Sequence, residues 1–165
     1  MAIFSAVFCR GQDDDEWRGV GVEGDLAEAG TIDDIADTMR DVSGAAAEGT
    51  MVLLVEADDE WFAVVRVDDH TDPRVFLSDV RVVHEHPVAA LLQESGGIEA
   101  PEQTEGTGQK PYPVPGGEPE LLADLGVPAG DLVSLTTGGG LLPGDVLAEI
   151  AERAGFAEPL DALRL

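Results

Sequence analysis

The loop DDHTDP lies between two apolar runs and carries side chains of the types that bind metal ions. Its three carboxylates and one imidazole belong to Asp68, Asp69, His70 and Asp72. Carboxylate oxygens bind hard divalent cations, and an imidazole suits several transition metals. The spacing of a calcium loop is absent, however, and Asp and Pro are common in hairpin turns. A hairpin turn is therefore the favoured interpretation, with a metal site as the alternative.

Two further histidines follow in the sequence HEHP. His84 and His86 are two positions apart, so they would lie on one face of an extended strand. Two imidazoles can begin a zinc site, but zinc needs at least a third protein ligand, and no partner motif accompanies them. We expect a strand end at the surface, with zinc binding as the alternative, and no motif indicates a cofactor.

Other motifs have a structural explanation. Residues Gly19 to Gly24 formally match G-x-G-x-x-G, but the next helix begins near Thr31 and Glu23 would oppose a phosphate. Cys9 is the single cysteine and lies in an apolar run, which predicts a buried side chain and excludes an intrachain disulfide. No nucleophile elbow or Walker loop is present, so no catalytic residue is predicted.

Trp61 and Phe62 form the start of a second apolar run. We expect them to be core or sheet-face residues, because large aromatic side chains bury much apolar surface. The alternative is that they form an interaction site, with Trp61 as an interface anchor, since tryptophan is enriched at binding hot spots.

The charge of the chain restricts its partners. Nine basic residues against 34 acidic ones give a net charge of −25, and the eight arginines and one lysine form no basic stripe. Direct binding to nucleic acid or to anionic membranes is therefore not expected. A basic protein partner would be attracted, although solubility alone also explains a high acidic content. The start MAIFSAVFCRGQ lacks the positive region of a signal peptide, and we expect a cytoplasmic protein.

The order of the elements predicts an α+β fold. Five segments are rich in β-branched and aromatic residues, at 2–10, 17–23, 50–57, 60–67 and 74–83. Helical periodicity covers 31–42, where Thr31 is a suitable N-cap, and a short helix follows Pro87. We expect a five-stranded, mainly antiparallel sheet with helices packed on it, in the order β-β-α-β-β-β-α. This order resembles profilin-like and roadblock-like folds in topology alone.

The composition changes after the sheet segments. Residues 95–119 contain five prolines and six glycines among 25 residues, which predicts a flexible linker. The division is therefore a sheet domain at 1–94, this linker, and a small helical segment at 120–165. Pro143 opens the clearest helix of that segment. The segment is too small for a large core of its own, so it is a mini-bundle, a docking element or both.

Three stretches carry a family resemblance. They are IDDIADTMRDV, VLLVEADDEWFAVVRVDDHTDPRVFLSD, and the tail LLADLGV to LLPGDVLAEIAERAGFAEPLDAL. Together they resemble the tRNA adenosine deaminase-associated proteins of high-GC Gram-positive bacteria. That family is named for lying beside a deaminase gene, and the resemblance implies no catalytic residues. A zinc deaminase needs H-x-E and P-C-x-x-C, and a chain with one cysteine lacks them.

Three hypotheses for function remain open. The leading one is a non-catalytic, acidic accessory protein that binds or regulates a tRNA adenosine deaminase or another basic protein. The second is a metal-binding protein or enzyme that uses the region of His70, His84 and His86 with nearby aspartates. The third is a self-assembling structural domain, which would form a homodimer through a sheet edge or a helix by analogy with roadblock-like folds.

Overall fold

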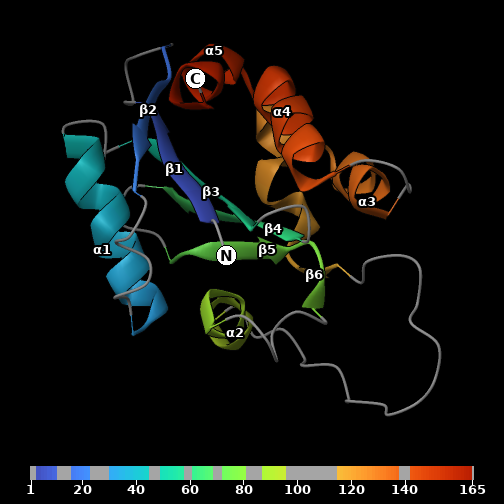
Figure 1. Cartoon of the computed structure of the whole chain (residues 1–165), viewed down its shortest axis with the longest axis horizontal. Coiled ribbons are helices and arrows are strands. Elements are labelled where there is room, and N and C mark those ends of the chain that lie inside the picture. Colours follow the sequence, from blue (N-terminus) through green and yellow to red (C-terminus); the bar gives the residue numbers. More distant parts are fainter. Residues whose placement is uncertain are drawn as a thin grey trace.

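A six-stranded antiparallel sheet lies between two layers of helices (Figure 1). The computed structural model describes residues 3–10, 16–22, 30–44, 49–57, 61–68, 72–80, 87–95, 115–137 and 142–164. The strands are β1 (Ile3–Arg10), β2 (Arg18–Gly21), β3 (Thr50–Ala57), β4 (Trp61–Asp68), β5 (Arg74–Leu77) and β6 (Gly116–Gly117). Their order in the sheet is β2-β1-β3-β4-β5-β6, and every neighbouring pair is antiparallel. The expected α+β class with an antiparallel sheet is confirmed.

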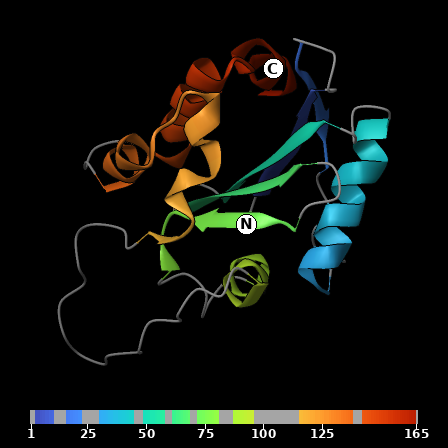
Figure 2. The ribbon, with the colours of Figure 1, turned by 180° about the vertical axis from the view of Figure 1, so that it is seen from behind.

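The helices α1 (Ile32–Ser43) and α2 (Pro87–Ser95) cover one face of the sheet, as Figure 2 shows from behind. At the N-cap of α1, the Thr31 hydroxyl accepts a hydrogen bond from the Asp34 amide at 3.2 Å. The Asp34 carboxylate accepts one from the Thr31 amide, also at 3.2 Å. This reciprocal capping box explains why the helix begins there. Its face with Ile35 and Met39 is buried against the sheet, as the periodicity predicts.

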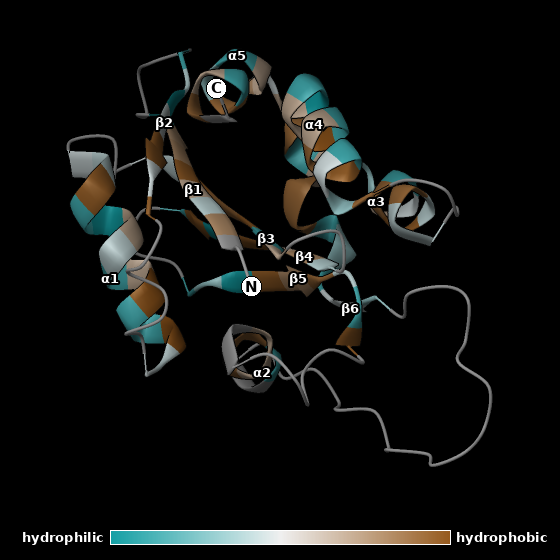
Figure 3. Ribbon diagram, viewed as in Figure 1, coloured by the Kyte–Doolittle hydropathy of each residue, from teal (hydrophilic) through white to brown (hydrophobic). Residues whose placement is uncertain are grey.

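A second layer of helices covers the opposite face. We call it the C-terminal layer; it consists of the 3-10 helix η4 (Pro119–Leu125) with α3 (Ala129–Thr137), α4 (Pro143–Ala154) and α5 (Ala157–Arg164). Phe156 stacks on Phe8 of β1 at 4.6 Å between ring centroids, and it meets the edge of Trp17 at 5.1 Å. The helical segment therefore docks on the sheet and shares a core with it. Figure 3 shows the apolar inner sides of this layer.

Alternate residues along each central strand face the two helical layers. On β4, Trp61 and Ala63 belong to the core under α1 and α2, whereas Phe62 and Val64 belong to the core under the C-terminal layer. Because both faces are covered, an almost continuous apolar run is stable in these strands. The absence of a clear polar alternation in the sequence follows from this burial.

The sheet has one strand more than the five expected. Strand β6 lies in the range predicted to be a linker, and its Gly117 pairs with Phe76 of β5. The Glu118 amide extends the contact by donating a hydrogen bond to the Val75 carbonyl at 2.9 Å. The count was wrong because two glycines carry no side-chain alternation from which a strand could be predicted.

Strand β5 is shorter than the segment 74–83 predicted for it. It ends at Leu77, and Ser78 continues the contact with β4 in a different way. The Ser78 hydroxyl accepts a hydrogen bond from the Phe62 amide at 2.8 Å, while the Ser78 amide donates to the Phe62 carbonyl at 3.0 Å. A side chain thus takes the place of a backbone acceptor at the strand end.

Within the described ranges, no helix is long and apolar enough to cross a membrane.

Candidate interaction surface

The described arginine side chains are engaged within the protein itself. Six of the nine basic residues have a contact inside the chain that the structure describes, namely Arg10, Arg18, Arg40, Arg66, Arg74 and Arg153. Each of them lies against an aromatic ring, a backbone carbonyl or a carboxylate. These arginines therefore make contacts within the chain itself. Acidic side chains then predominate on the described surface.

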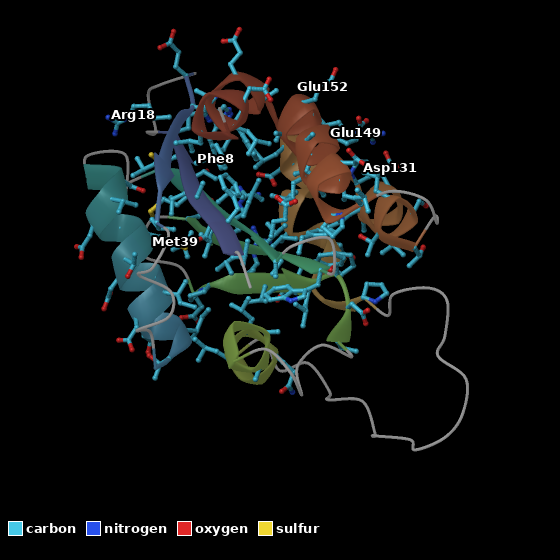
Figure 4. All side chains as sticks on the ribbon, in the orientation of Figure 1. Phe8, Arg18, Met39, Asp131, Glu149 and Glu152 are labelled. Atoms are coloured by element: carbon cyan, nitrogen blue, oxygen red, sulfur yellow. The ribbon has the colours of Figure 1, made fainter. Side chains whose placement is uncertain are left out.

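Two arginines lie at the β1–β2 end of the sheet. The Arg10 guanidinium lies 4.8 Å from the centroid of the Trp17 ring, a cation–π contact. The Arg18 Nη2 donates a hydrogen bond to the backbone carbonyl of Ser43 at 3.1 Å, which ties β2 to the end of α1. Figure 4 labels Arg18 at this edge of the molecule. Both contacts stabilise the β1–β2 end of the sheet, and both arginines of this edge are engaged in them.

Arg66 is the most deeply buried of the described arginines. Its side chain is 5% exposed, and it contacts Asp68 on its own strand and Asp124 on η4. Burial opposes its charge, but the hydrogen bond to Asp124 and the charge of Asp68 raise the pKa of Arg66 above its ordinary value. The hydrogen bond from Arg66 lowers the pKa of Asp124, against the smaller effect of burial. Both side chains are therefore charged at neutral pH.

A second ion-pair group joins two helices within the C-terminal layer. Arg153 on α4 contacts Asp131 on α3 at 2.7 Å and Glu149, one helical turn earlier, at 2.9 Å. Hydrogen bonds to Glu149 and then Asp131 raise the pKa of Arg153. Asp131, Glu149 and the nearby Glu152 lie on the outer side of this layer in Figure 4. Its outer side is therefore acidic, with one described arginine among the carboxylates.

The outward side of α1 is acidic as well. Asp33, Asp37 and Asp41 are exposed and four residues apart, which places them along one face of the helix. Arg40 pairs with Asp37 at 3.5 Å and reduces the negative charge of that face only in part. The two helical layers cover opposite faces of the sheet, so these exposed carboxylates lie on two different sides of the molecule.

The structure places few of the residues predicted as metal ligands. Asp68 lies at the end of β4 in ion pairs with Arg66 and Arg74, and Asp72 is exposed just before β5. Asp69, His70, His84 and His86 lie outside the described residues. In the part of the chain that is described, no group of three or more His, Cys, Asp or Glu side chains could hold a metal ion. The metal hypothesis for the histidine region therefore stays a prediction.

The two aromatic residues named as interaction candidates are buried. Trp61 is 0% exposed in the core under α1 and α2, and Phe62 is 2% exposed in the core under the C-terminal layer. The expectation that they are core residues is confirmed. In this structure neither side chain offers surface to a partner, so their interaction role stays a prediction without structural support.

The predictions for the glycine motif and the cysteine can be compared with the structure directly. Gly19 and Gly21 lie in strand β2, as the strand interpretation of that motif requires, and Gly24 lies outside the described residues. Cys9 is buried in β1 with 1% exposure, which confirms the expected small buried side chain.

Sequence reasoning missed the pairing of Arg66 with Asp124, which are 58 positions apart. A signal was present, because Arg66 interrupts the apolar run WFAVVRV in a strand expected to be covered on both faces. A charge at such a position requires a buried partner. The partner itself could not be identified, since several carboxylates of the C-terminal segment were equivalent candidates in sequence.

Comparison with known proteins relates this chain to a protein family. A family model described as "Rv3753c-like tRNA adenosine deaminase-associated protein" matches residues 4–157. Protein Rv3753c of Mycobacterium tuberculosis is 30% identical over 116 residues, which is 70% of this chain and 64% of that protein. The match thus spans less than two thirds of the length of the mycobacterial relative.

No solved structure matches this chain, so the resemblance in topology to profilin-like and roadblock-like folds stays a prediction. The family match extends over nearly the whole sheet, over α1 and α2, and over the C-terminal layer as far as the start of α5. This chain therefore belongs to the family of Rv3753c-like tRNA adenosine deaminase-associated proteins.

Proposed function

We propose that this chain is a non-catalytic accessory protein of the cytoplasm that binds a tRNA adenosine deaminase through its acidic surface. The family description supports an association with such an enzyme. The observation that carries the electrostatic part is the distribution of charge. The net charge is −25, and the described arginines contact groups of the chain itself while the acidic sides of α1 and α4 are exposed.

The physical basis of the proposal is complementarity of charge. An enzyme that binds tRNA must present cations to the phosphate backbone, because neutralised phosphates release counterions and so provide much of the affinity. A strongly acidic protein is attracted to the same cations and accelerates its own encounter with them. Binding at that surface would compete with tRNA, whereas binding beside it would stabilise the enzyme without competition.

The test is co-elution of this protein with a tRNA adenosine deaminase from the same genome on a sizing column. The Debye length falls from about 10 Å at 0.1 M salt to about 3 Å at 1 M salt, so an electrostatic complex should dissociate as salt rises. Added tRNA should displace the protein if both use one surface. A complex that persists at high salt would contradict the electrostatic mode, and no complex at either salt would contradict the proposed function.

Charge variants show which side of the molecule makes the contact. The triple variant D33N/D37N/D41N neutralises the acidic face of α1, and E120Q/E152Q/E158Q removes the same number of exposed charges from the C-terminal layer, so the two variants compare the two sides. The side that faces the enzyme should lose more affinity on neutralisation. Equal losses would indicate that total charge is recognised, and no loss in either variant would contradict binding through the acidic surface. Circular dichroism checks the fold, because Asp33 also stabilises the N-terminus of α1 by about 0.3–1 kcal/mol.

A further inference from the structure

Arg66 is a charged side chain inside the contact between the sheet and the C-terminal layer. The residue is 4% exposed, and it lies on the same face of β4 as Phe62 and Val64, which belong to the apolar core of that contact. Apolar contacts are non-directional, so they favour docking of the layer without selecting one arrangement in detail. A guanidinium differs from them because its donors have fixed directions.

All three nitrogens of Arg66 have acceptors in the structure. Nε donates to the Asp68 carboxylate at 3.2 Å, and Nη1 donates to the Leu121 carbonyl at 2.8 Å and to Asp124 Oδ1. Nη2 donates to Asp124 Oδ2 at 2.8 Å, which makes the pair with Asp124 bidentate. Leu121 and Asp124 are about one turn apart on η4, so these acceptors meet the guanidinium together in one orientation of that helix.

We infer that Arg66 fixes the orientation in which η4, and with it the C-terminal layer, docks on the sheet. Strand β6 fixes where the layer begins, but a strand of two residues does not determine the rotation of the following helix about its axis. Rotating η4 would remove Asp124 and the Leu121 carbonyl from the guanidinium. The guanidinium would then keep only Asp68 of its own strand, and its Nη1 would lose both of its acceptors. Leaving the donors of a buried cation unsatisfied is unfavourable, so the observed orientation is favoured over the others.

The segment before β6 explains why the orientation of η4 would need to be fixed by a contact such as that of Arg66. Nineteen residues, 96–114, separate the end of α2 from the start of the described C-terminal part, and seven of them are Gly or Pro. The flexible linker that this composition predicts would transmit no orientation to the helices that follow it. The orientation must then come from the contact itself, where Arg66 provides the directional part.

The test is the double variant R66M/D124L, which replaces the ion pair by apolar side chains of similar size. Such replacements often leave stability unchanged, so Tm should stay near that of the parent protein. In two-dimensional amide NMR spectra we expect more than one set of peaks for residues 119–137, with a single set for residues 50–57 of β3. A role in stability alone would instead lower Tm and leave one set of peaks.

Two further variants serve as controls. R153M removes an arginine that also has two carboxylate partners, but within the C-terminal layer, and it should leave a single set of peaks. D124E keeps a carboxylate at this position and should give the same spectrum as the parent protein. If R66M/D124L does not fold, D124A is the deciding variant, because it removes both carboxylate acceptors from a side chain that is 64% exposed and loses little packing. One set of peaks in D124A, or in a folded R66M/D124L, would overturn the inference.

Discussion

At the scale of single residues, the pair of Arg66 and Asp124 shows how a charge is tolerated in a core. The guanidinium is desolvated on an apolar sheet face, and its charge is compensated by one carboxylate that is largely exposed and one on its own strand. The exposed carboxylate is hydrated on its outer side, which reduces the desolvation cost of the pair. The arrangement therefore keeps an ion pair at the boundary of the core with a limited penalty.

This pair predicts a dependence of stability on pH that D124N should remove. The pKa of Asp124 is lowered in the folded protein, so its stabilisation is present above the unfolded pKa of about 3.9 and is lost as the pH falls through the folded value. At neutral pH we expect D124N to lower the free energy of unfolding by about 1 kcal/mol, a low value for a charged hydrogen bond because the carboxylate is exposed.

Urea denaturation of the parent protein and D124N at neutral pH and below about pH 4 measures this effect. The difference between the two proteins should shrink progressively as the pH falls from the unfolded pKa of Asp124 towards its lower folded pKa, because the stabilisation by the charged carboxylate is lost over that range. Asp131, which contacts an exposed arginine within the layer, provides a control in D131N. A difference that stays constant with pH would show that the charge of Asp124 does not stabilise the fold.

At the scale of elements, the short strand β6 closes the sheet at its β5 edge. Gly117 has φ of 100°, a conformation that residues with a side chain rarely adopt, and a Cβ there would lie 2.2 Å from the Val75 carbonyl oxygen. The backbone of β6 can approach β5 this closely because position 117 has no side chain. The entry of the chain into the C-terminal layer thus depends on glycine.

G117A should therefore destabilise the protein. We expect a loss of about 1–3 kcal/mol in the free energy of unfolding from backbone strain, together with weaker protection of the Glu118 amide from hydrogen exchange. G130A is the matched control, because Gly130 lies in helix α3 and a Cβ added there would meet no atom within 4 Å. That variant should be neutral or more stable by up to about 1 kcal/mol. Equal effects of both variants would contradict a special role for Gly117.

At the scale of the whole molecule, the sheet and the C-terminal layer form one structural unit through their shared core. Of the buried residues in that core, twelve come from residues 121–160 and eight from residues 6–76. Burying one large aliphatic or aromatic side chain contributes about 1.5–3 kcal/mol, so separating the two parts would expose far more surface than a stable domain can lose. We therefore expect the shared core to hold the two parts together without a continuous backbone between them.

Because of this shared core, we expect the two parts of the protein to stay associated after the backbone between them is cleaved. A protease site inserted within residues 96–114 should be cleavable, and the two fragments should then co-elute from a sizing column with an unchanged far-ultraviolet circular dichroism spectrum. Addition of urea should separate them in the same transition that unfolds the sheet. Fragments that separate in the absence of denaturant would show that the sheet domain and the helical segment are independent, as domains divided at the linker would be.

Much of the local structure could be predicted from the sequence because it depends on short-range rules. The cap at Thr31, the buried face of α1 with Ile35 and Met39, and the helix opened by Pro143 all follow from residue types at fixed spacings. The burial of Trp61 follows from its place in an apolar strand. Strand β6 and the end of β5 at Leu77 did not follow, because glycine backbone pairing and the Ser78 hydroxyl leave no periodic signal.

Composition and local periodicity indicate the class of fold and the acidic character, because both are properties of the chain alone. The family follows from the resemblance of three stretches to known proteins and from the family match. Only the tertiary structure decided that the C-terminal helices cover the second face of the sheet, and which carboxylate pairs with Arg66. Both depend on contacts between residues that are far apart in the sequence. Apolar contacts are non-directional, so the sequence does not show which apolar residues pack against one another. The contacts become defined only when the helices are docked on the sheet.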